Sequence, residues 1–150
     1  MLERYYVTPE NMYTTGGNEK ILYTPIVIVR SAEHAHVYVA GRTARLPNGE
    51  LAGAGDMRAQ LRLVCQNTGQ ALEYVGADFS DVVRTTTYTM DIEEYYRCSD
   101  ERFKFFTDPL PTSTLIGVAR LGWAEMLVEI EVEAIMEPER LKIPANAVRK

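Results

Sequence analysis

Two neighbouring segments in the last third of the chain show the clearest patterns of apolar and polar positions. Residues 111–121 are apolar on both faces, whereas residues 127–135 alternate strictly, with Glu129, Glu131 and Glu133 on one face. Strict alternation has the period of two that is typical of a β-strand. We therefore expect a β-hairpin that turns near residues 122–125. Both faces of its first arm have to be buried against other residues. Its row of glutamates has to be solvated, paired with other groups or used in a functional site.

Apolar positions at steps of three and four predict two amphipathic helices in the middle of the chain. Asp56 is a suitable N-cap for the first helix, and Gly76 stands where a left-handed residue would end it. Asp91 caps the second helix, which the prolines of residues 108–111 terminate. The first stripe comprises Met57, Leu61, Val64, Thr68, Leu72 and Val75, and the second comprises Ile92, Tyr95, Tyr96, Ser99, Phe103 and Phe106.

Further strands are predicted by three segments rich in β-branched residues, namely residues 21–29, 36–40 and 82–90. The element order is then β-β-α-β-α-β-β in one domain, residues 1–150, with an irregular N-terminal arm over residues 1–20 and a tail over residues 136–150. This order predicts an α+β fold with one mixed sheet and two helices packed on one face. The other face would lie open in a monomer, so we expect self-association through it.

The composition bounds the class of protein. The chain has 150 residues, a formal net charge of −5 and a hydrophobic content of 46%, which suits a domain with a sizeable core. An acidic balance argues against a broad nucleic-acid-binding surface, which needs clustered Lys and Arg. No apolar run approaches the length of a membrane span, and the first residues lack the pattern of a signal peptide, so we expect a cytoplasmic protein.

The two cysteines, Cys65 and Cys98, are too few for a disulfide framework, and both fall within helical patterns. We expect buried, reduced thiols. A nucleophilic cysteine stays open as an alternative, although no His partner stands nearby in the sequence.

Four blocks between residues 37 and 135 stand in a distinctive order and spacing. They are Val37-Tyr38-Val39-Ala40-Gly41-Arg42; Gln60, Asn67, Leu72 and Gly76-Ala77; residues 81–88 followed by Asp91; and residues 111–121 with Val128-Glu129-Ile130-Glu131. In this arrangement the chain resembles the RidA (YjgF/YER057c/UK114) family. The resemblance implies a chorismate-mutase-like α+β fold and a homotrimer with clefts between subunits. It also implies hydrolysis of reactive enamines and imines, such as 2-aminoacrylate, to keto acids and ammonia, with no metal or organic cofactor.

The chain departs from the family pattern at the positions that bind substrate. Ser113 stands where family deaminases carry an Arg that holds the substrate carboxylate, and Leu115 replaces a Cys. Ser99 aligns with a family Asn, whereas the hairpin glutamate is retained as Glu129. A guanidinium holds a carboxylate through two charge-assisted hydrogen bonds, and a hydroxyl cannot replace its charge. Either another cation serves in this chain, or the ligand is not a small carboxylate.

Glu129 is the catalytic candidate, because the resemblance places it at the cleft, where a carboxylate could position or deprotonate a water that attacks a C=N carbon. A solvated or paired strand face is the alternative, and the stronger one for Glu131 and Glu133. The candidates for substrate binding are Gly41, Arg42, Ser99, Thr112 and Ser113.

Two other groups of residues carry weaker signals. Arg42 occupies a family Gln position near the cleft and could supply the missing positive charge, or it could be a surface residue, as we expect Arg45 to be. Glu33, His34 and His36 have a spacing compatible with metal binding, but with only two histidines in the chain we expect no metal site.

The leading hypothesis is a homotrimeric RidA-like hydrolase, a deaminase acting on an imine, enamine or related C–N bond of a small metabolite at clefts between subunits. One alternative is a non-catalytic trimer that binds a small metabolite or a partner protein. Another is C–N chemistry on a larger or aromatic substrate, because Leu115 and the serines would leave a roomier, less charged pocket. Neither a nucleic acid nor a membrane is expected as a partner.

Overall fold

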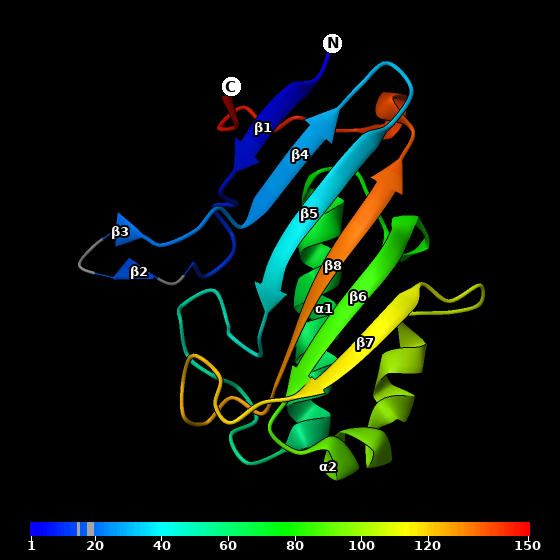
Figure 1. Cartoon of the computed structure of the whole chain (residues 1–150). Coiled ribbons are helices and arrows are strands. Elements are labelled where there is room, and N and C mark those ends of the chain that lie inside the picture. The colour runs from blue at the N-terminus through cyan, green and yellow to red at the C-terminus, as the bar shows by residue number, and fades with distance from the viewer. Residues whose placement is uncertain (15, 18–19) are drawn as a thin grey trace.

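A seven-stranded sheet with helices on one face forms the body of the molecule in the computed structural model, which describes residues 1–14, 16–17 and 20–150 (Figure 1). Both termini lie at the same end of the sheet, beside β1. The strands are β1 (Glu3–Val7), β2 (Gly16–Gly17), β3 (Lys20–Ile21), β4 (Ile26–Arg30), β5 (Ala35–Arg42), β6 (Val82–Thr89), β7 (Thr112–Gly117), β8 (Val128–Met136) and β9 (Val148–Arg149). The helices are α1 (Met57–Tyr74) and α2 (Ile92–Arg97), with short 3-10 helices η1 (Phe79–Asp81), η2 (Ser99–Lys104) and η3 (Pro138–Arg140).

The order of strands across the main sheet is β7-β6-β8-β5-β4-β1-β9. Strands β6 and β7 are parallel and the other neighbours are antiparallel, so the sheet is mixed. The predicted α+β class, and the predicted sequence of strands and helices from β4 to β8, are confirmed. Two strands join this set from segments for which none was predicted.

The predicted hairpin of the last two strands is wrong, because β6 lies between β7 and β8. Helix α2 and η2 connect β6 to β7, and such a crossover returns the chain parallel to its starting strand. Strand β8 buries Val128, Ile130 and Val132 and pairs with β5 and β6 at the centre of the sheet. Strand β7 instead forms an exposed edge, so in a single chain its apolar residues are not buried on both faces.

The irregular arm predicted over residues 1–20 is wrong for Glu3–Val7, which pairs antiparallel with β4. Tyr5 and Val7 are buried in the core on one side of this strand. On the far side of β1 the tail contributes β9, whose Arg149 forms an ion pair with Glu3. Short-range alternation over five residues was too brief to distinguish this strand from a loop.

Helix α1 follows the prediction closely. The Asp56 carboxylate accepts a hydrogen bond of 3.0 Å from the Ala59 amide, and Gly76 has a φ of 85° just beyond the helix. All six residues of the predicted stripe are buried against the sheet. The cap, the stripe and the terminal glycine agree with one another, which is why the helix could be read from local sequence.

The second helix buries Tyr95 and Phe106 of its predicted stripe, but the rest of its buried face differs from the prediction. Tyr96 and Phe103 are 60% and 56% exposed, whereas Glu101 and Arg102 are buried. The chain passes from an α-helix to a 3-10 helix after Arg97, and the tighter winding rotates the residues that follow. The Arg102 guanidinium then reaches the hydroxyls of Thr85 and Thr87 on β6.

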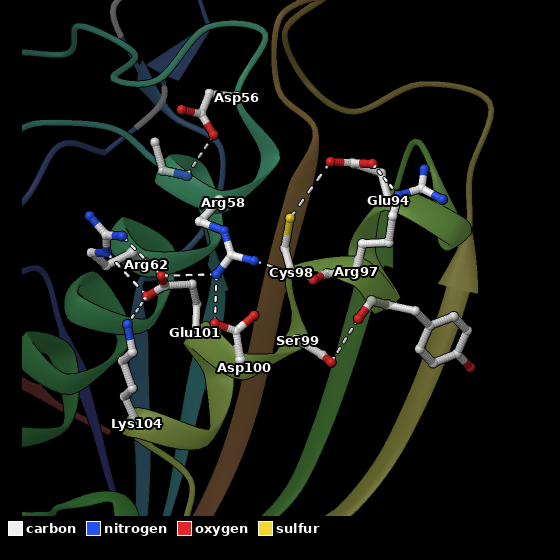
Figure 2. Close-up of polar contacts among 12 residues, drawn as sticks. Asp56, Arg58, Arg62, Glu94, Arg97, Cys98, Ser99, Asp100, Glu101 and Lys104 are labelled. Carbon is white, nitrogen blue, oxygen red and sulfur yellow. Dashed lines mark hydrogen bonds and ion pairs between the residues drawn. The ribbon is translucent and has the colours of Figure 1, made fainter.

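A buried carboxylate joins this segment to α1 (Figure 2). Glu101 is 2% exposed and accepts hydrogen bonds from Arg62 at 2.9 and 3.1 Å, from Lys104 at 2.9 Å and from Arg58 at 3.2 Å. Arg58 also binds Asp100 at 2.6 Å. The bonds from Arg62, Lys104 and Arg58 hold the pKa of Glu101 well below its usual range. The cluster therefore ties η2 to α1 as long as Glu101 is ionised.

Replacing Glu101 with Gln is expected to lower the melting temperature at neutral pH, because two arginines and a lysine lose their shared carboxylate. Since the pKa of Glu101 is lowered by folding, its contribution is present above the ordinary value of 4.5 and is lost as the pH falls below it. Thermal unfolding between pH 7 and pH 3 should show the gap between E101Q and wild type narrowing with acid. The control E94Q removes an exposed ion pair with Arg97 and should change little. An E101Q variant as stable as wild type at pH 7 would contradict this role.

Candidate functional site

Glu129 lies on the face of β8 that the helices do not cover. The alternation along β8 turns Val128, Ile130 and Val132 towards the helices and places the three glutamates on the opposite face. Glu131 accepts a hydrogen bond of 2.8 Å from the Tyr88 hydroxyl. Glu133 lies 3.2 Å from Nε2 of His36, which stacks on Tyr38. Among the described residues, Glu129 is the glutamate of this row whose side chain makes no hydrogen bond.

The carboxylate of Glu129 rests directly against the backbone of Gly41. A Cβ atom at position 41 would overlap Oε1 of Glu129, so only glycine allows this approach. The local backbone is irregular, because Val39 faces Val132 and Arg42 faces Ile130 across the ladder, leaving Ala40 and Gly41 opposite Glu131 alone. This β-bulge carries Gly41 up to the carboxylate.

A pocket of about 310 Å³ opens beside this contact. Its lining comprises Tyr23, Ala40, Gly41, Thr43, Gly122, Trp123, Met126 and Glu129. Burial and the nearby charge of Glu131 raise the pKa of Glu129, and Arg42 opposes them with a smaller, lowering effect. A half-buried carboxylate with a raised pKa beside an open cavity can accept a proton from a water molecule and return it later.

Arg42 does not line the pocket of Glu129. It is 6% exposed, faces Ile130 across the ladder, and borders a smaller recess of about 20 Å³ next to the pocket. Burial lowers the pKa of Arg42, while Tyr23 and Glu129 partly compensate. The structure therefore brings the charge of Arg42 near the catalytic candidate, although no ion pair joins the two side chains.

Arg45 is buried, and the prediction of a surface arginine is wrong. The residue is 6% exposed, and its guanidinium lies between two aromatic rings, 3.7 Å from the centroid of Trp123 and 4.7 Å from that of Tyr13. It also donates a hydrogen bond to the Gly49 carbonyl. Sequence reasoning missed this arrangement because both rings are distant in the chain and no local pattern marks them.

The remaining candidates lie elsewhere on the chain. Thr112 and Ser113 begin the edge strand β7, where the Thr112 hydroxyl donates to the Val83 carbonyl at 3.0 Å. Ser113 stands beside Thr85 in the ladder, two strands and three positions from Glu129, which corresponds to roughly 14 Å. The Ser99 hydroxyl, at the start of η2, donates to the Tyr96 carbonyl at 2.8 Å. One chain thus brings Gly41 and Glu129 together, and keeps Ser99, Thr112 and Ser113 away from them.

The groups considered for metal binding are separated. The Ser31 hydroxyl accepts hydrogen bonds from the backbone amides of Glu33 and His34 in the turn before β5, while His36 is engaged with Glu133 on the sheet. Within the described ranges, no group of three or more His, Cys, Asp or Glu residues is arranged to hold a metal ion. In the same part of the chain, none of the helices combines the length and the apolar character needed to traverse a lipid bilayer.

The cysteines are both free and buried, as predicted. Burial raises the pKa of Cys65 to about 12 and also raises the pKa of Cys98. A thiol with a raised pKa is protonated at neutral pH and is a weak nucleophile. The raised pKa values therefore argue against the alternative of a nucleophilic cysteine.

Comparisons with known proteins identify the family and the fold of the chain. A family model described as Endoribonuclease L-PSP matches residues 23–136. A RutC family protein of Pyrococcus abyssi is 30% identical over 102 residues, 67% of this chain and 79% of that protein. The 2-iminobutanoate/2-iminopropanoate deaminase of Homo sapiens is 26% identical over 102 residues, 68% of this chain and 74% of that enzyme. A crystal structure from Mycobacterium tuberculosis, a member of the YjgF/YER057c/UK114 family, is 29% identical, with a TM-score of 0.66 over 83% of this chain and 98% of that chain.

The carboxyl group of Glu129 is expected to titrate above the ordinary glutamate value of 4.5, because burial and Glu131 both disfavour its ionised form. Titration of the side-chain carboxyl carbons by NMR measures this pKa directly. E131Q should lower the pKa of Glu129 by removing the like charge. E133Q, two positions further along the same face, is the matched control and should leave it unchanged. A pKa of Glu129 at or below 4.5 in the wild type would refute the electrostatic description.

Proposed function

The chain belongs to the RidA (YjgF/YER057c/UK114) family, with its chorismate-mutase-like α+β fold, and from this we propose that it is a deaminase hydrolysing an imine or enamine of a small metabolite. The observation that carries the proposal is the state of Glu129. On the open face of β8 it is the carboxylate left unpaired by the described side chains, it borders a pocket of about 310 Å³, and its pKa is raised.

The proposed reaction uses Glu129 as a general base and then as an acid. Glu129 takes a proton from a water molecule while the water oxygen bonds to the C=N carbon and the C=N electron pair moves to nitrogen, which then receives that proton from Glu129 to give a neutral carbinolamine. Glu129 next takes the hydroxyl proton of the carbinolamine as the C=O group forms and the C–N bond breaks, and it passes that proton to the leaving nitrogen, which departs as ammonia. One water is consumed for each imine, and an enamine first shifts a proton to carbon to become an imine. A carboxyl group serves both steps best when its pKa lies near the working pH.

We propose that the complete site forms between copies of the chain in a homotrimer. Gly41 and Glu129 would come from one subunit, and Ser99, Thr112 and Ser113 would come from its neighbour. The separation of roughly 14 Å between Glu129 and Ser113 within one chain supports this division. The exposed edge strand β7 and the uncovered face of the sheet supply surfaces for the assembly.

One observation favours a second candidate function. Ser113 and Thr112 offer hydroxyls, and none of the described side chains of β7 carries a positive charge that would hold a substrate carboxylate. A trimer of this kind could bind a metabolite without converting it. Ribonuclease activity is less well supported than either function, because the chain has a net charge of −5 and carries three glutamates on its open face.

Purified protein is expected to release ammonia from freshly generated 2-aminoacrylate or from a bulkier imine. E129A should lower kcat by about 10²- to 10⁴-fold, the usual contribution of a general acid–base group. G41A should also lower it, because the added methyl group displaces the Glu129 carboxylate. E139A, an exposed substitution on η3, is the control. Wild-type protein that binds such ligands in a thermal-shift assay but converts none of them would favour the binding function instead.

Light scattering at micromolar concentration is expected to give the mass of three chains. Mixing E129A with a variant carrying a bulky residue at position 113, S113W, should restore part of the activity, because some clefts of a mixed trimer receive both intact residues. Each variant alone should be nearly inactive. A monodisperse monomer that turns over imines at the wild-type rate would disprove the shared cleft and leave the deaminase chemistry standing.

A further inference from the structure

We propose that Arg42 and Arg45 together form a receptor for the carboxylate group of a planar ligand whose body occupies the pocket of Glu129. The inference rests on the proposed function in one respect, that this ligand is the substrate. It adds which residues of this chain would bind the carboxylate, in place of the arginine that family deaminases carry at the position of Ser113.

The first observation is an excess of buried positive charge. Arg42 and Arg45 are each 6% exposed and stand three positions apart in the sequence. Nε of Arg42 and both Nε and Nη2 of Arg45 are buried without a hydrogen-bond partner among the residues that the structure describes. Buried guanidiniums are normally paired with a carboxylate, and an unpaired donor loses its bonds to water without replacement. Two such groups together suit an anion supplied from outside the chain.

The second observation is that space adjoins the two arginines. Recesses of about 10 and 20 Å³ are each bordered by both arginines. The larger recess shares Tyr23, Gly41 and Thr43 with the pocket of Glu129, so the two lie side by side. A volume of this size admits about one small polar atom. It suits a carboxylate oxygen that enters from the pocket, and it is too small for a whole phosphate group.

The third observation concerns rigidity. Arg45 is held between the rings of Tyr13 and Trp123 and is bonded to the Gly49 carbonyl, so its free donors have a fixed direction. Such a pre-organised cation loses little conformational freedom when it binds an anion. Trp123 and Tyr23 also line the neighbouring pocket, where their rings suit a flat, unsaturated body.

In this proposal each feature of the site binds a different part of the ligand. The two arginines would anchor the carboxylate, the aromatic lining would hold the plane of the ligand, and Glu129, in contact with Gly41 between the recess and the pocket, would face the C=N carbon. The positive charge that the edge strand lacks at Ser113 would thus come from the end of β5 and the loop after it.

Isothermal titration calorimetry with benzoate and with its neutral isostere benzamide, in chloride-free buffer at pH 7, tests the receptor without any turnover. Benzoate is expected to bind at least tenfold more tightly than benzamide, the discrimination that a charge-assisted hydrogen bond provides. R42Q and R45Q should each weaken benzoate binding about tenfold or more and leave benzamide unaffected. R42K retains the charge and should recover part of the loss. E129Q should bind benzoate at least as tightly as wild type, because a like charge has been removed.

The matched control is R97Q, which removes an exposed arginine from α2 and should bind benzoate normally. Equal binding of benzoate and benzamide by the wild type, or no binding of either, overturns the receptor even if an arginine variant fails to fold. Unchanged benzoate affinity in folded R42Q and R45Q overturns it as well. If benzoate binds as expected but no imine is hydrolysed, the proposed deaminase function fails and the receptor stands. If imines are hydrolysed and benzoate binding does not depend on the arginines, the receptor alone fails.

Discussion

The constraint on which the rest of the structure depends is the one-sided cover of the sheet. Helix α1 and the α2–η2 segment pack on one face, and the alternation of β8 sends its valines and isoleucine into that core (Figure 1). Because successive side chains of a strand point to opposite faces, the remaining side chains of β8 lie on the open face. The glutamate row, the tyrosines beside it and the pocket of Glu129 are all consequences of this arrangement. The acidic face also discourages non-specific stacking of flat sheets, because like charges would meet.

The electrostatics of the molecule depend on where carboxylates and arginines are paired. Glu101, surrounded by Arg62, Lys104 and Arg58, is held in its ionised form and serves the architecture. Glu129 has the opposite environment, since burial and a neighbouring glutamate favour its protonated form. The surroundings thus shift the pKa values of two glutamates of one chain in opposite directions. The arginines divide in the same way, because Arg62 is bonded to a carboxylate whereas Arg42 and Arg45 have donors to spare.

Local sequence predicted the parts of the fold that depend on local periodicity. Helix α1 and the alternating strand β8 combine a strong pattern with matching termini, and both were identified correctly. The pairing of β7 was not, because a strand chooses its neighbour through contacts distant in sequence. The buried face of the second helix was missed because a change to 3-10 winding after Arg97 alters the period.

The candidate site shows the same division between local and distant information. The contact of Gly41 with Glu129 joins two strands far apart in sequence, and the family pattern was needed to suggest both residues. Arg45 gave no signal at all, because its burial depends on Tyr13 and Trp123. Ser99, Thr112 and Ser113 lie apart from Glu129 in one chain, and that separation could be seen only in three dimensions.

The bulge in β5 also determines how this surface could change in evolution. By placing Ala40 and Gly41 opposite Glu131 alone, it inverts the phase of the strand, so that Arg42 turns to the helical side while Gly41 meets the carboxylate. Deletion of one residue there would remove the bulge that carries Gly41 up to the Glu129 carboxylate, while Arg42 would keep its place opposite Ile130. A single indel, rather than a series of substitutions, would therefore alter the backbone beneath the carboxylate and leave the neighbouring arginine in register.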